Sequence, residues 1–233
     1  MVISTRTKFT DQLNEVEDLV RRFGEKTVAD VRAAGLAVTG DKGAAEGVME
    51  GRKAEDRLRS AIENTCLDIM LLQQPLIGVD LRFVSGSFRM VSDLSHIDSM
   101  TRDAVFLAEE IPEKAVKKLE KEFTTLSAYA ANMVNKAVDA FCTTDVEMAQ
   151  QVMEADTAVN DLYAEAEEKL VGLIRDGKSS AQYLPELLMV AKYFERMGDL
   201  AKRIAAWAVF RATGEHTVAE KESQRLVQPG SEE

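Results

Sequence analysis

The chain has 233 residues with 45% hydrophobic and 30% charged side chains, a composition that can bury a sizeable core in one or two domains. Its 13 glycines, 4 prolines and 6% aromatic residues are too few for the frequent turns and β-rich packing of sandwiches and barrels. The formal net charge of −11 repels phosphate backbones, so we expect no nucleic acid partner.

About six long helices are predicted, separated by short polar or proline-containing breaks. Residues 39–43 (Thr-Gly-Asp-Lys-Gly) end the first helix, and Pro75 ends the second because its ring removes a backbone donor. Pro112 stands near the start of the fourth helix, where a missing N–H costs little. Residues 144–147 (Thr-Asp-Val-Glu) form a capping box for the fifth helix, which residues 176–180 close.

Apolar spacing of three and four residues supports these helices. Series of this kind begin at Ala149 and at Leu184. Another contains Val116, Leu119, Phe123, Leu126, Ala130, Met133, Ala137 and Phe141. This spacing gathers the apolar side chains on one face, as in the seam of a helical bundle.

The two halves of the chain repeat one another. Residues 48–50 (Val-Met-Glu) recur as residues 152–154, about a hundred positions later. We therefore predict an all-α fold of two tandem three-helix bundles, with an N-terminal repeat at residues 1–110 and a C-terminal repeat at residues 111–214. Residues 215–233 are polar, and we expect them to be a disordered tail.

The sharpest local pattern is a pair of carboxylates, Glu195 and Asp199, four residues apart and so within about 6 Å on one helix face. The preceding helix carries Asp156 at a seam position and Asn160 one turn later. Carboxylate and amide oxygens from two facing helices suit iron, manganese, magnesium or calcium. The pattern therefore points to a metal site made by these four residues.

Two other interpretations use the same residues. A salt-bridge network with Arg196, Lys202 or Arg203 explains the acidic spacing equally well. A carboxylate-bridged metal oxidase fits less well, because neither His96 nor His216 stands in a Glu-x-x-His motif. The sequence also lacks a glycine-rich phosphate loop and a nucleophile elbow, so nothing in it indicates an enzyme.

The expected location is the cytoplasm. Cys66 and Cys142 are too few for a disulfide framework, and we expect them to be buried structural thiols in a reducing compartment. Residues 1–11 lack the apolar segment of a secretory signal. The longest apolar stretch, residues 205–210, is far short of the roughly 18 residues that span a bilayer.

Two separated motifs resemble the PhoU family of phosphate-transport regulators. Residues 191–199 (Ala-Lys-Tyr-Phe-Glu-Arg-Met-Gly-Asp), followed by Ile-Ala-Ala-Trp at 204–207, resemble the C-terminal signature of that family. Gln-Gln-Pro at 73–75 and Asp-Leu-Arg at 80–82 resemble its N-terminal half. The resemblance extends over about residues 9–214 and implies the same duplicated three-helix layout.

The resemblance implies a regulatory adaptor without catalytic activity. Such an adaptor negatively regulates the high-affinity phosphate ABC transporter and holds its sensor histidine kinase in a repressing state when phosphate is plentiful. The implied partners are the cytoplasmic subunits of the transporter, the kinase and a second copy of the chain, with peripheral association at the membrane. A metal-free helical scaffold derived from the same fold is the alternative.

The resemblance also implies metal ligands, since several family members bind metal clusters through Glu/Asp-x-x-x-Asp pairs. Glu195 and Asp199 match one pair, and Asp156 with Asn160 matches the pair on the preceding helix.

The N-terminal half departs from this pattern. The matching positions there are Arg52, Asp56, Ser95 and Ser99, which together provide one carboxylate, two hydroxyls and a guanidinium. Such a set cannot hold a hard cation. Any bound metal, as a single ion or a multinuclear cluster of iron, manganese, zinc or magnesium, is therefore expected in the C-terminal bundle only.

Overall fold

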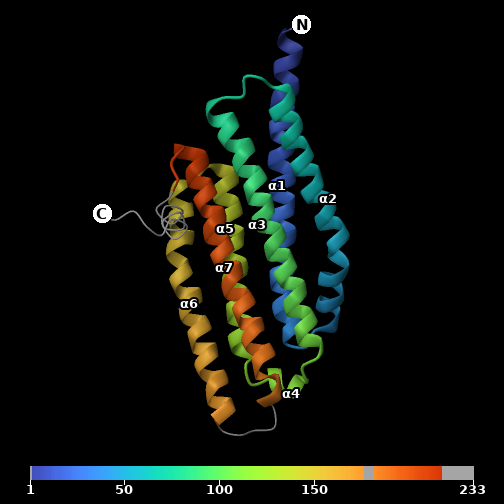
Figure 1. Cartoon of the computed structure of the whole chain (residues 1–233), viewed down its shortest axis with the longest axis vertical. Helices are drawn as coiled ribbons and strands as arrows, with labels where there is room; N and C mark the ends of the chain where they lie inside the picture. The colour runs from blue at the N-terminus through green and yellow to red at the C-terminus, as the bar shows by residue number, and fades with distance from the viewer. Residues whose placement is uncertain (1, 176–180, 217–233) are drawn as a thin grey trace, which may run out of the picture.

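The computed structural model describes residues 2–175 and 181–216, which form six long helices in two groups of three (Figure 1). In chain order the elements are α1 (Val2–Val38), α2 (Lys42–Leu72), α3 (Gly78–Glu109), the single turn α4 (Glu113–Val116), α5 (Glu120–Thr143), α6 (Val146–Arg175), the 3-10 turn η1 (Ala181–Tyr183) and α7 (Leu184–Thr213). The described residues contain no strand. The predicted break at 176–180 and the predicted disordered tail beyond residue 216 lie outside the described residues.

The first two helix breaks lie where turn chemistry predicted them. Gly40 follows α1 with a φ of 113°, which glycine adopts without a steric penalty. The side chain of Asp41 accepts a hydrogen bond from the backbone N–H of Ala44 at 3.0 Å and so caps the start of α2. The second helix ends at Leu72, three residues before Pro75.

Two predicted helix starts are wrong by a few residues. Pro112 precedes only the single turn α4, and the long helix α5 begins at Glu120. Thr144 does not cap α6; it ends α5 in the left-handed conformation, with a φ of 59°. Asp145 caps α6 instead, by accepting a hydrogen bond from the N–H of Met148 at 2.9 Å. Adjacent Thr and Asp can both cap a helix, and only the path of the chain decides which one does.

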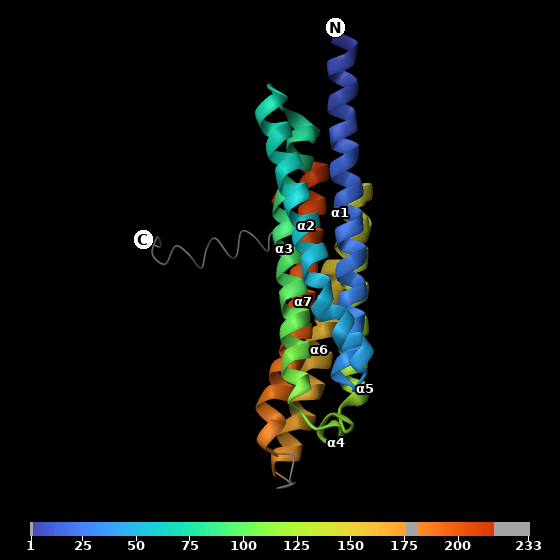
Figure 2. The same ribbon diagram turned by 90° about the vertical axis from the view of Figure 1, so that its right-hand side faces the viewer.

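The six long helices pack as one elongated bundle. Helices α1, α2 and α3 contact one another, and α5, α6 and α7 form the second group. The groups are joined where α1 packs on α5 and where α3 packs on α7. Figure 1 shows α2 and α6 on the two outer flanks, and the turned view in Figure 2 shows the helices running along the long axis. The predicted all-α fold of two tandem bundles is confirmed.

One apolar core runs through both halves. All eight members of the apolar series that begins at Val116 are buried, as the spacing predicted. The largest side chains of the core include Phe23 of α1, Phe123 and Phe141 of α5, and Phe194 of α7, each fully buried. Burying each phenylalanine side chain contributes about 1.5–3 kcal/mol to the stability of the bundle.

Glycines allow α1 and α5 to approach closely. A Cβ atom placed on Gly35 of α1 would lie 2.5 Å from the Cβ of Ser127 on α5, and one placed on Gly24 would lie 2.6 Å from Cγ1 of Val138. These distances are far below van der Waals contact, so side chains at these two positions would push the halves of the molecule apart.

Gly35→Ala is therefore expected to lower the free energy of unfolding by about 1–3 kcal/mol, because the added methyl overpacks the contact between α1 and α5. Gly47→Ala in α2 is the matched control, since nothing lies within 4 Å of a Cβ there. That change is expected to raise stability by about 0.5–1 kcal/mol through helix propensity. Urea denaturation followed by circular dichroism measures both, and equal effects from the two variants would contradict the close packing.

The two cysteines are free and buried, as predicted. Burial raises the pKa of Cys66 to about 12 and that of Cys142 to about 11. The thiolate is the reactive form, so neither thiol of the folded protein is expected to react with a disulfide reagent at about pH 8. In denaturant, both thiols are expected to react. Rapid labelling of the folded chain would show that one thiol is accessible.

None of the helices in the described part of the chain combines the length and the apolar content needed to cross a membrane.

Candidate functional site

The four residues predicted as metal ligands lie along α6 and α7 of the C-terminal group. Asp156 of α6 is buried, Glu195 of α7 is half-buried, and Asn160 and Asp199 are exposed. Partial burial raises the pKa of Asp199, and the negative charges of Glu195 and Asp156 raise it further. Glu195 and Asp156 therefore both lie within electrostatic reach of Asp199.

Lysine side chains neutralise two of these acids. The Nζ atom of Lys202 lies 2.7 Å from Oδ2 of Asp156, and the Nζ atom of Lys192 lies 2.7 Å from Oε1 of Glu195. Lys202 was among the cations of the salt-bridge interpretation, whereas Lys192 was not. The second oxygen of Glu195, Oε2, is buried without a hydrogen-bond partner in the described part of the chain. The carboxylates of Asp156, Glu195 and Asp199 do not form a group with all ligand oxygens within 4.8 Å.

Three other acids do form such a group, inside the N-terminal bundle. Asp30 of α1, Glu55 of α2 and Asp98 of α3 each offer a carboxylate oxygen, and these oxygens all lie within 4.8 Å of one another. The three residues are 5%, 4% and 1% exposed. Among the described residues, they are the group of three acidic, histidine or cysteine side chains that can hold a metal ion. The candidate thus lies in the half where the sequence pattern predicted none.

These acids were missed because the family motif aligns with neighbouring positions, such as Asp56 and Ser99, and not with the acids themselves. Asp56 and Ser99 are exposed, whereas Glu55 and Asp98, each one residue earlier, are buried. One residue rotates the side chain by about 100° around a helix, enough to turn it from solvent to the core. Glu55 stands seven residues from both Val48 and Ile62, which are buried. An acid in register with this apolar series was the signal that could have found the cluster.

Two basic side chains reach the cluster from its edge. The Nζ atom of Lys26 pairs with Oδ2 of Asp30 and lies 3.4 Å from Oε1 of Glu55. The Nη1 atom of Arg102 pairs with Oε2 of Glu55. Neither oxygen of Asp98 has a hydrogen-bond partner among the described residues. Three carboxylates thus face two cations, and Asp98 is the one left without a direct partner.

The pKa values of two of these acids reflect this environment. Burial raises the pKa of Asp98 well above its usual value, and the charges of Glu55 and Asp30 raise it further. Burial also raises the pKa of Asp30 to about 6, although Lys26 acts in the opposite direction. Each carboxylate therefore favours either a proton or a further cation beside it.

A polar contact connects the two halves near the C-terminal motif. Asp93 of α3, a buried acid, accepts a hydrogen bond from Nε of Arg203 at 2.9 Å and also pairs with its Nη2 atom. The indole N–H of Trp207 lies 3.3 Å from the other oxygen of Asp93. Arg203 was predicted to neutralise the acids of its own half, and its partner is instead an acid of the N-terminal half.

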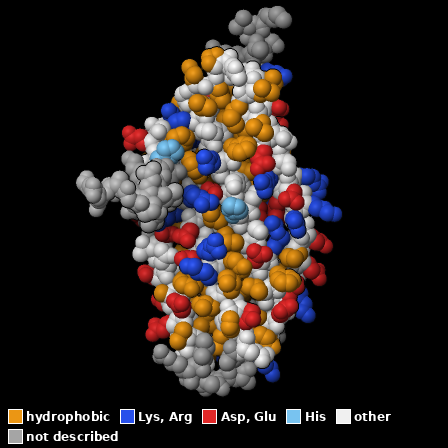
Figure 3. Space-filling view, viewed as in Figure 1, with side chains coloured by type: hydrophobic (Ala, Val, Ile, Leu, Met, Phe, Trp, Pro, Cys, Tyr) orange, Lys and Arg blue, Asp and Glu red, His pale blue; other side chains and the backbone are white. Residues whose placement is uncertain are grey.

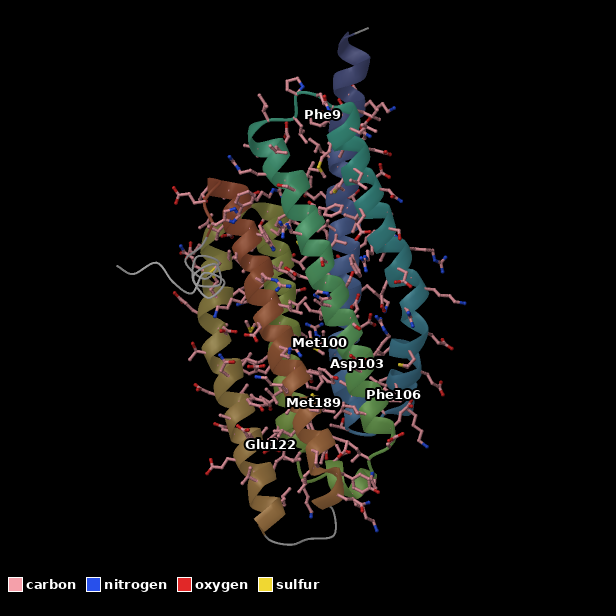
Figure 4. All side chains as sticks on the ribbon, in the orientation of Figure 1. Phe9, Met100, Asp103, Phe106, Glu122 and Met189 are labelled. Carbon is pink, nitrogen blue, oxygen red and sulfur yellow. The ribbon has the colours of Figure 1, made fainter. Side chains whose placement is uncertain are left out.

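An open groove lies between α3 and α7, where the two halves meet. Its lining includes His96, Met100 and Asp103 from α3 and Tyr193, Arg196 and Asp199 from α7. Met100 and Asp103 are labelled on α3 in Figure 4, and Figure 3 shows charged side chains of both signs over this face. Residues from both halves of the chain therefore line one shared surface.

The helical groups coincide with two matches to one family model. The model described as "PhoU domain" matches residues 20–105, within α1–α3, and residues 123–208, within α5–α7. A crystal structure of PhoU from Pseudomonas aeruginosa superposes with a TM-score of 0.80 over 89% of this chain and 100% of that chain. The sequence identity is 23%, so this similarity is one of fold.

Curated relatives match over most of their length. A phosphate-specific transport system accessory protein PhoU homolog from Aquifex aeolicus is 31% identical over 175 residues, covering 73% of this chain and 77% of that protein. A protein of the same description from Clostridium acetobutylicum is 25% identical over 213 residues, covering 90% of this chain and 96% of its own length. Two matched domains and these relatives together show that the chain belongs to the PhoU family.

Proposed function

We propose that this chain is an accessory regulator of a phosphate-specific transport system. The observation that carries the proposal is the match of both halves to the PhoU domain, at residues 20–105 and 123–208. Support comes from relatives that are described as accessory proteins of phosphate-specific transport and that align with 90% of this chain. The proposed role is therefore that of the whole two-bundle chain rather than of one half.

The proposed mode of action is binding rather than catalysis. When phosphate is plentiful, the protein restrains the high-affinity phosphate ABC transporter and keeps its sensor histidine kinase in a repressing state. It does so in the cytoplasm, at the membrane surface, by contact with the cytoplasmic subunits of the transporter and with the kinase. A metal-free scaffold of the same fold is the competing function, and it would bind neither partner in a phosphate-dependent way.

Deletion of the gene is expected to raise phosphate uptake and transporter expression in phosphate-rich medium, because the restraint on transporter and kinase is lost. Uptake of labelled phosphate measures this effect, with the intact gene returned on a plasmid as the control. Unchanged uptake in a strain that has no second PhoU-family gene would contradict the regulatory role.

A binding assay with the proposed partners distinguishes the regulator from the metal-free scaffold. Tagged transporter subunits and kinase are expected to retain the chain on a column when phosphate is present, whereas a scaffold with other partners would flow through. The proposed homodimer is tested on the same preparation by sedimentation equilibrium, which distinguishes a single chain of 25.8 kDa from a pair.

We also propose that Asp156, Asn160, Glu195 and Asp199 hold metal in the C-terminal bundle. The buried, unpartnered Oε2 atom of Glu195 and the raised pKa of Asp199 support this set, because a cation would satisfy both carboxylates. Lys192 and Lys202 would have to turn away from Glu195 and Asp156.

Elemental analysis of protein purified without chelator tests the C-terminal set. Metal is expected in the intact chain, and the Glu195→Ala, Asp199→Ala double variant is expected to lose the metal held by the C-terminal set, because two of the four ligands are gone. An unchanged metal content in the double variant would show that the C-terminal set holds no metal.

A further inference from the structure

The N-terminal bundle buries three carboxylates at one point between its helices. Asp30, Glu55 and Asp98 come from three different helices, and none of them lies at a position where the family pattern supplies a metal ligand. Like charges at this spacing repel, and taking each of them out of water is costly. Such a cluster persists only where positive charge or protons offset the repulsion.

The basic side chains near the cluster offset the repulsion among the three carboxylates only in part. Lys26 and Arg102 reach Asp30 and Glu55, but both oxygens of Asp98 are buried with no hydrogen-bond partner among the described residues. The hydroxyl of Thr27 is also fully buried and unpartnered within the described part of the chain. As a nearby hydroxyl donor it lowers the pKa of Asp98, so it faces that carboxylate. The hydroxyl of Thr27 and the carboxylate of Asp98 are therefore adjacent buried groups, and neither is in a salt bridge within the described part of the chain.

The spacing of the oxygens fits a hard cation. Two oxygens on opposite sides of a Mg²⁺ or Ca²⁺ ion stand about 4.2–4.8 Å apart, given bond lengths of about 2.1–2.4 Å. The nearest oxygens of Asp30, Glu55 and Asp98 all lie within 4.8 Å of one another. An ion placed among them would need only small side-chain movements to reach all three.

The ammonium of Lys26 occupies the position that a metal ion would take. It lies between Asp30 and Glu55, and the lysine side chain is 28% exposed at the edge of the bundle. A Cβ on Gly51 would lie 2.5 Å from that ammonium, so the glycine leaves the room that Lys26 uses. The long flexible stem can withdraw toward solvent. With Lys26 withdrawn, the charge of a divalent ion together with Arg102 balances the three carboxylates.

We propose that Asp30, Glu55 and Asp98, with the hydroxyl of Thr27, bind one divalent cation of the Mg²⁺ or Mn²⁺ class in competition with the ammonium of Lys26. This site is separate from the one proposed in the C-terminal bundle and does not depend on the regulatory function. The N-terminal bundle then has two forms. In one, Lys26 pairs with Asp30 and Glu55, and in the other the metal ion binds to these carboxylates.

The test is titration of the full-length chain with Mn²⁺, after chelator treatment, in the Glu195→Ala, Asp199→Ala background so that the C-terminal acids do not contribute. One Mn²⁺ per chain is expected to bind, and binding is expected to be lost in Asp98→Asn and in Asp30→Asn. Lys26→Met is expected to tighten binding about tenfold or more, because the competing ammonium is removed. Asp56→Asn, an exposed neighbour on α2, is the matched control and is expected to leave affinity unchanged.

A thermal melt of each variant shows that it folds and gives a second measurement. Mn²⁺ is expected to raise the melting temperature of the parent chain and of Lys26→Met, but not of Asp98→Asn. Absence of binding in the folded parent and in folded Lys26→Met would overturn the proposal and would indicate that a proton on Asp98 neutralises the cluster. Binding that survives Asp30→Asn and Asp98→Asn would overturn it as well.

Discussion

Phe141→Ala is expected to lower the free energy of unfolding by about 3–5 kcal/mol, because the change leaves a cavity where the two halves meet. The ring of Phe141 on α5 is fully buried and stacks on Phe83 of α3 with centroids 6.1 Å apart. The guanidinium of Arg211 on α7 lies 5.3 Å from its centre. A Cβ on Gly86 of α3 would lie 3.0 Å from the ring, so the neighbouring helix is already in close contact.

Chemical denaturation followed by circular dichroism measures this loss, and Phe106→Ala is the control. Phe106 lies on α3 like Phe83, but its side chain is 57% exposed (Figure 4), so its loss is expected to change stability by less than about 0.5 kcal/mol. We expect a single transition for the parent chain, since α1–α5 and α3–α7 contacts join the halves. A small effect of Phe141→Ala, or separate unfolding transitions of the two halves, would contradict tight packing between the halves.

Asp93→Ala is expected to lower stability by about 2–3 kcal/mol, because it leaves the buried indole N–H of Trp207 without an acceptor. The side chain of Arg203 is 48% exposed and regains water when Asp93 is removed, so it adds little to the loss. Most of the effect is therefore expected to come from Trp207.

A double-mutant cycle with Trp207→Phe separates the two contributions. In the Trp207→Phe background, Asp93→Ala is expected to cost about 1.5–2 kcal/mol less than in the parent chain, since no indole donor remains to be orphaned. Asp103→Ala is the control, because Asp103 is an exposed acid on the same helix. Equal losses in both backgrounds would show that the Trp207 contact does not contribute.

Much of the fold followed from local pattern. The three-and-four spacing that begins at Val116 predicted the buried face of α5, because a helix repeats its faces every 3.6 residues whatever its neighbours are. The breaks at Gly40 and Pro75 followed from backbone stereochemistry, which each residue carries with it. Where two neighbouring residues could cap a helix, as at Thr144 and Asp145, the local pattern chose the wrong one.

The sites depend on long-range geometry instead. The sequence located the acids of α6 and α7, since Glu195 and Asp199 are four residues apart on one helix. It did not locate Asp30, Glu55 and Asp98, which are separated by 25 and 43 positions and meet only when three helices pack together. It likewise did not show that Arg203 pairs with Asp93 of the other half.

The sequence by itself thus determined the helical class and the apolar faces of α5, α6 and α7, because these depend on spacings of three to seven residues. It also determined the duplicated layout, because residues 48–50 recur at 152–154. Only the tertiary structure decided which charges become neighbours, since side chains from different helices meet according to helix rotation and register. A rotation of one residue, about 100°, separates exposed Asp56 from buried Glu55. The local apolar series shows that Glu55 lies on the buried face of α2, but the packing of three helices decides which other acids it meets.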